Sequence, residues 1–79
     1  MNTTPLPQGY TEASSVSYQD HSTRRSRVEA AMFTAPGMPT LYFAEATGFN
    51  AMPVHRITAH DYDLHLLTAI KHGTCVPQH

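Results

Sequence analysis

Acidic and histidine side chains are concentrated in one short stretch of the sequence. His60, Asp61, Asp63 and His65 fall within six residues, and His72 follows a little later. Imidazole and carboxylate groups serve as metal ligands and as general acids or bases, so the stretch raises the question of a metal or catalytic site. Asp61 and His65 have the i,i+4 spacing at which two helical ligands can share an ion. His65 and His72 would lie about 10 Å apart along a helix axis, which is too far.

Cys75 is the single cysteine of the chain. Paired with His72 or His60 it is the one combination that suggests covalent catalysis, and with His72 it would form half of a metal site. No glycine-rich phosphate loop and no third orienting group accompany these residues in the sequence. We therefore expect no enzyme activity, cofactor or metal. A metal-dependent module using Asp61, His65, His72 and Cys75 is the alternative that the residue types leave open.

Most residues of the same stretch have positions that are typical of the two ends of a helix. Thr58 has the position and side chain of an N-cap residue. Ile57 and Tyr62 take the two positions of a hydrophobic staple around that cap. Gly73 suits the left-handed conformation that often follows the last helical turn. The sequence therefore predicts a helix over residues 58–72.

The helical period predicts which side of this helix meets the core. Apolar residues that fall within about 100° of one another form the expected inner stripe. That stripe consists of Tyr62, Leu66, Ala69 and Ile70. Leu64 and His65 are expected on the solvent side, where they would be available to a partner.

A β-hairpin is predicted over residues 27–47. Pro36 and Gly37 suit the two central positions of a type II turn, with Ala35 and Met38 closing it. This turn predicts a register in which one face of the hairpin collects the apolar residues Val28, Ala30, Met32, Leu41 and Phe43. Phe33 and Tyr42 then lie on the opposite face, so something must cover that face as well.

The first 22 residues are small, polar and interrupted by proline, without a sustained period of 2 or 3.6. Such a composition offers little apolar surface to offset the entropy lost on ordering. We expect residues 1–22 to be a flexible or extended arm, with Tyr10 and Tyr18 able to lie along another surface. Residues 23–79 are expected to form a small α+β domain: an antiparallel hairpin or three-stranded meander with one C-terminal helix packed across it.

Length and charge narrow the classes of partner. A chain of 79 residues buries only about 60% of the surface that its unfolded form exposes, and one cysteine allows no internal disulfide, so self-association is an open possibility. The net charge is −1 with five Lys and Arg, which argues against nucleic acid. No apolar run approaches the roughly 20 residues that span a bilayer. We expect a protein partner and neither nucleic acid nor membrane.

Two pieces of the sequence resemble a known family. The stretch "LYFAEATGFN" and the later "ITAHDYDLHLLTAIKHG" are similar to the N-terminal module of phage tail-fibre assembly proteins. The matching residues between positions 40 and 76 are Tyr42, Phe43, Thr47, Gly48, Phe49, Ile57, Thr58, Tyr62, Leu66 and Gly73. The chain differs from that family in its N-terminal arm, an additional hairpin strand and a shorter linker before Ile57. The resemblance implies a small phage or prophage protein, located in the host bacterial cytoplasm or in the virion.

The resulting functional hypothesis is non-enzymatic protein binding, as a virion or tail-associated component or as an assembly factor. The alternative is a small inhibitor of a bacterial defence system, of the anti-CRISPR type, acting by steric blocking; the nearly balanced charge argues against mimicry of nucleic acid. Aromatic and exposed apolar residues concentrate interface energy. The residues predicted to contact a partner are therefore Tyr10, Tyr18, Phe33, Tyr42, Leu64 and His65.

Overall fold

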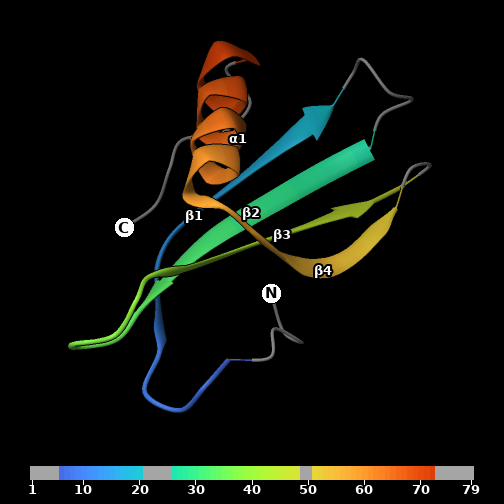
Figure 1. Cartoon of the computed structure of the whole chain (residues 1–79). Coiled ribbons are helices and arrows are strands. Elements are labelled where there is room, and N and C mark those ends of the chain that lie inside the picture. Colours follow the sequence, from blue (N-terminus) through green and yellow to red (C-terminus); the bar gives the residue numbers. More distant parts are fainter. Residues whose placement is uncertain (1–5, 21–25, 49–50, 73–79) are drawn as a thin grey trace.

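The computed structural model describes residues 6–20, 26–48 and 51–72. Its elements in chain order are β1 (Thr11–Asp20), β2 (Ser26–Thr34), β3 (Leu41–Thr47), β4 (Met52–Ile57) and α1 (Ala59–His72). The strands form one antiparallel sheet in the order β1-β2-β3-β4. In Figure 1, α1 lies over one face of this sheet. The expected α+β class is confirmed, with four strands where two or three were predicted.

β1 is the additional strand, and it lies within the predicted arm. The arm was expected over residues 1–22, whereas Thr11–Asp20 pair with β2 along their length. Val16 and Tyr18 are only 2% and 5% exposed because the sheet and α1 together cover them. Their neighbours in the strand are small and polar, so the period-2 pattern is weak in the sequence. The pairing of β1 with β2 also shifts register between Glu12 and Ser14. The arm and the domain are thus not separate in this part of the chain.

The turn that joins β2 and β3 forms as predicted. The backbone N–H of Met38 donates to the carbonyl oxygen of Ala35 at 3.1 Å, and Gly37 has φ +69°. This positive φ is the conformation that the third position of a type II turn needs and that glycine adopts without strain. The position of the turn was therefore readable from the sequence.

The strand register beyond this turn differs from the prediction by one residue. Phe33 lies opposite Leu41 and Met32 opposite Tyr42, whereas a symmetric turn would have placed Met32 opposite Leu41. Residues Pro39 and Thr40 extend the connection on one side only, since β3 begins at Leu41 while β2 ends at Thr34. Proline has no N–H with which to continue the ladder.

A one-residue slip moves every side chain of one strand to the other face. Leu41 and Phe43 therefore lie with Phe33 on the face away from α1. Tyr42 lies on the opposite face, which α1 covers. The prediction that placed Phe33 and Tyr42 together on one face is wrong, as is the grouping of Leu41 and Phe43 with the residues of β2 beneath the helix.

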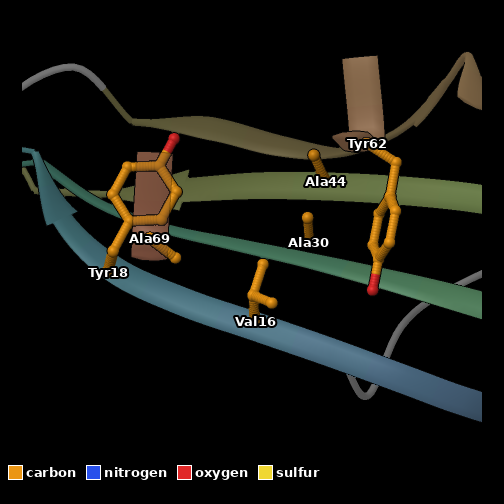
Figure 2. Packing of buried hydrophobic residues seen from close by; sticks show 6 residues of the cluster. All are labelled: Val16, Tyr18, Ala30, Ala44, Tyr62 and Ala69. Carbon is orange, nitrogen blue, oxygen red and sulfur yellow. The ribbon is translucent and has the colours of Figure 1, made fainter. Parts of the chain in front are cut away.

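The face beneath α1, here called the helix face, combines alanines with tyrosine rings. Its buried residues are Val16, Tyr18, Ala30, Ala44, Tyr62 and Ala69. Figure 2 shows the two tyrosines at opposite ends of this cluster, with the alanines and Val16 between them. Ala30 and Ala69 are fully buried. Because alanine side chains occupy little space, α1 can approach the sheet closely.

The other face of the sheet, here called the second face, is covered by the chain's own N-terminal strap, Leu6–Tyr10. The buried residues there are Ala31, Phe33, Leu41 and Phe43, and Leu6, Tyr10 and Val54 pack against them. The hydroxyl of Tyr10 donates to the carbonyl oxygen of Pro39 at 2.6 Å. The covering that the hairpin required thus comes from within the predicted arm.

Among the described residues, no helix is long and apolar enough to cross a membrane. The one helix that these residues contain, α1, has 14 residues.

Candidate functional site

The start of α1 is fixed by its cap. The backbone N–H of Asp61 donates to the Thr58 hydroxyl at 3.1 Å, and the N–H of Tyr62 donates to the Thr58 carbonyl at 3.0 Å. Ile57 and Tyr62 both pack in the helix-face cluster, as a staple requires. The predicted cap is confirmed, and the predicted closing residue Gly73 lies outside the described residues. This end determines where along the sheet the helix begins.

Tyr62 connects α1 to two strands of the sheet, β3 and β1. Its ring lies 5.2 Å from that of Tyr42 in β3, at an interplanar angle of 42°. Its hydroxyl makes a 2.7 Å hydrogen bond with the Ser14 hydroxyl in β1. A buried tyrosine needs a partner for its O–H group, and this one finds it on the edge strand.

A second polar contact fixes α1 near its middle, one turn after Tyr62. The Tyr18 hydroxyl and Nδ1 of His65 are 2.8 Å apart, and the two rings lie 6.0 Å apart. Both groups are partly buried between α1 and β1. With the Tyr62 contact, this pair sets the rotation of α1 about its own axis.

Burial lowers the pKa of His65 below its ordinary value of 6.5, because the imidazolium form loses hydration in this position. The Asp61 carboxylate acts in the opposite direction and His55 acts in the same direction, both more weakly than burial. Neutral imidazole is therefore the favoured form at neutral pH, and its Nδ1 can accept the hydroxyl proton of Tyr18 as a hydrogen bond.

The rotation of α1 differs from the predicted one. His65, expected in solvent, is partly buried against Tyr18, while Ile70, expected in the inner stripe, is 56% exposed. Tyr62 and Ala69 are buried as predicted. The physical reason is β1: because an unforeseen strand lies beneath the helix, the side of α1 that faces it becomes an inner side.

This rotation places three large apolar side chains in solvent. Leu64, Leu67 and Ile70 are 49%, 61% and 56% exposed. They are spaced three residues apart and share the side of α1 that is turned away from the buried Ala69. We call them the outer face of α1, and it is the candidate functional site.

Five of the six predicted partner contacts have contacts within the chain itself. Tyr18 and Phe33 are each only 5% exposed, and Tyr42 is partly buried against Tyr62, so these rings are engaged in the protein's own core. Tyr10 belongs to the N-terminal strap. His65 is bound to Tyr18.

Leu64 is the predicted contact residue that belongs to the outer face. Leu67 and Ile70 were missed as surface residues. Ile70 was placed in the inner stripe, and Leu67 was not among the residues expected on the solvent side. The sequence did contain a signal for this exposure. The large apolar residues of α1 are more numerous than one inner stripe over a small sheet can bury.

The residues considered for metal binding or catalysis do not assemble in the described part of the chain. There, no group of three or more His, Cys, Asp or Glu side chains is arranged to hold a metal ion. Asp61 and His60 are exposed on the first turn of α1. Cys75 and the side chain of His72 lie outside the residues that can be described.

Comparisons with known proteins found no matching family model, no matching curated protein and no matching solved structure.

Proposed function

We propose that this protein acts by binding another protein, without chemistry of its own, through the outer face of α1. The single observation that carries the proposal is the exposure of Leu64, Leu67 and Ile70, each about half or more in solvent on one side of one helix. One exposed leucine is ordinary in a soluble protein. Three that are contiguous on a helix form an apolar patch of the kind that marks interaction sites.

The geometry of the patch fits a known mode of recognition. An amphipathic helix presents apolar side chains at successive turns to an apolar groove or to another helix. In α1 the inner side is already used, with Tyr62 and Ala69 buried against the sheet. The outer side is therefore a second apolar surface on a helix whose position is fixed, which limits the entropy lost on binding.

The biological setting that we propose is a phage or prophage particle, with the protein as a virion or tail-associated component or as an assembly factor. The support is the similarity of residues 40–76 to the N-terminal module of tail-fibre assembly proteins. A small inhibitor of a bacterial defence system is the second candidate. Its support is the nearly balanced charge, six Asp and Glu against five Lys and Arg, which suits blocking by an apolar surface better than mimicry of nucleic acid.

Site-specific crosslinking tests the binding surface. A photo-reactive amino acid replaces Leu67 in the full chain, which is produced in a bacterium that carries the gene in its natural context. The matched control carries the same amino acid in place of Met38, which is 55% exposed on the β2–β3 turn. We expect covalent adducts to protein from position 67 and few from position 38.

Mass spectrometry of the adducts then distinguishes the assembly role from the inhibitor role. Particle proteins among the adducts support the assembly role, and a host defence protein supports the inhibitor role. Equal labelling from both positions, or no protein adduct from position 67, would mean that the outer face is not a binding surface.

A further inference from the structure

The outer face of α1 has a symmetric pattern of residues about Leu67. Leu64 and Ile70 lie three residues before and after it, and Asp63 and Lys71 lie four residues before and after it. All five side chains are exposed. The acidic residue precedes the apolar group and the basic residue follows it. Such a pattern is complementary to itself when the helix direction is reversed.

We infer that the protein bound by the outer face is a second copy of this chain, with the two α1 helices antiparallel about a two-fold axis that passes by Leu67. The inference rests on the proposed function in using the same surface, and it adds the identity of the partner. In this arrangement Leu67 meets Leu67 of the second copy, and Leu64 meets Ile70 of the second copy. Asp63 then lies beside Lys71 of the second copy, and by symmetry the same ion pair forms twice.

The surface of a helix supports this pairing. Asp63, Leu67 and Lys71 follow one another at intervals of four residues, so they lie on a single ridge of the helix surface. Asp63 and Lys71 are separated by about 12 Å along the axis. When two such ridges run antiparallel and cross at Leu67, each carboxylate reaches the ammonium group of the other helix while the leucines fill the space between.

The charges select a second copy in this orientation. A parallel pairing would place Asp63 beside Asp63 and Lys71 beside Lys71 of the second copy, which is unfavourable on both sides. An unrelated partner would need its own basic and acidic groups at matching positions, whereas a second copy carries them. The net charge of −1 gives little overall repulsion between copies, and closed two-fold dimers are the commonest oligomers.

The position of α1 leaves room for this contact. Figure 1 shows that the helix lies over one side of the sheet, so its far side is turned away from all four strands. The inner contacts of Tyr62 with Ser14 and of His65 with Tyr18 hold that orientation. A second helix can therefore approach without displacing any described strand.

Three apolar side chains from each copy and two ion pairs form a small interface, well below the roughly 800 Å² per partner of a standard one. We therefore expect a weak dimer, with a dissociation constant on the order of 100 µM. Sedimentation velocity and equilibrium over a range of protein concentrations, up to about ten times that constant, measure the association of the full chain directly.

Charge reversal provides the decisive test. The variants Asp63→Lys and Lys71→Asp each place like charges beside each other at both symmetric contacts, so each alone should dissociate about tenfold more readily. Mixed in equal amounts, the two variants should form a heterodimer, because one then carries two basic groups and the other two acidic groups. The double variant Asp63→Lys/Lys71→Asp should dimerise as the parent does. These differences should shrink in about 1 M salt.

Two further variants separate association from folding. Leu67→Glu should abolish the dimer while the circular dichroism spectrum and melting curve stay close to those of the parent, because Leu67 is 61% exposed. Met38→Glu, at a similarly exposed position on the β2–β3 turn (55%), should leave the dimer intact.

A parent protein that stays monomeric throughout this range overturns the inference, and so does an equal mixture that associates no better than either charge variant alone. In that case crosslinks from position 67 to a different protein would still support the proposed function. Crosslinks from position 67 to no protein would contradict both.

Discussion

The two faces of the sheet are covered in different ways. The helix face is covered by a regular element, α1, which lies on alanines and is fixed by two side-chain hydrogen bonds to β1. The second face is covered by the irregular N-terminal strap, which packs against the cluster that contains Phe33 and Phe43 and is held by a hydrogen bond from Tyr10 to Pro39. The helix face thus combines buried alanines with hydrogen-bonded tyrosines, whereas the second face buries two phenylalanine rings. Substitutions should therefore affect the two faces differently.

The largest expected effect is on the second face. Phe43 is 4% exposed and its ring lies 5.8 Å from that of Phe33 in an edge-to-face arrangement. Phe43→Ala should lower the free energy of unfolding by about 3–5 kcal/mol, as much as the core of a domain this small supplies. Chemical denaturation would then show a largely unfolded chain in water. Met38→Ala, at an exposed position, is the control, and a Phe43→Ala protein as stable as that control would contradict the packing described.

On the helix face the sensitive direction is an increase in size. Ala30 is fully buried beneath α1, so Ala30→Leu should force the helix away from the sheet and lower stability by about 1–3 kcal/mol. Relative to the parent protein, the rate of amide hydrogen exchange should increase more in α1 than in β2 and β3. Ala51→Leu is the matched control, because Ala51 is exposed. Unchanged exchange in α1 would show that the helix does not rest on this alanine.

The hydrogen bonds on the two faces should also differ in strength. Tyr18→Phe leaves the partly buried Nδ1 of His65 without this hydroxyl, and we expect a loss of about 1–2 kcal/mol. Tyr10→Phe removes an exposed contact to Pro39, where water can replace the hydroxyl, so the loss should be about 0.5 kcal/mol. Thermal melts of the two variants measure both values. The reverse order would mean that the strap, not the helix, depends more on its polar contact.

The smallest expected effect is a pH dependence confined to the helix face. Burial holds the pKa of His65 in the folded protein below the 6.5 of the unfolded chain. Between these two pKa values the unfolded chain binds more protons, so stability is fully present above pH 6.5 and falls as the pH drops toward the folded pKa. The denaturation midpoint, measured across this pH range, should depend less on pH in His65→Gln. It should keep its dependence on pH in His60→Gln, since His60 is exposed; an equal loss of pH dependence in both variants would falsify the assignment to His65.

Local features of the fold were predictable from the sequence. The Thr58 cap and the turn with Gly37 formed as expected because each depends on a few neighbouring residues. The strand register did not, because Pro39 and Thr40 lengthen one side of the connection and the turn alone cannot reveal that. β1 was missed because its burial comes from α1, which lies more than thirty residues away in the sequence.

The candidate site was only partly predictable for a related reason. Leu64 could be recognised as lying off the inner stripe, whereas the exposure of Leu67 and Ile70 depends on how α1 is rotated. That rotation is set by contacts with Ser14 and Tyr18, on a strand that the sequence did not reveal.

Local sequence specifies the α+β class, the capped helix near residues 58–72 and the β2–β3 turn, because hydrogen bonds and backbone preferences within a few residues fix them. It also determined the order of Asp63, Leu67 and Lys71 along one ridge, which follows from helical geometry alone. Long-range packing sets which face each strand residue occupies, places the strap on the second face and turns this ridge toward solvent. Those outcomes depend on contacts between distant segments, whose free energies no local pattern contains.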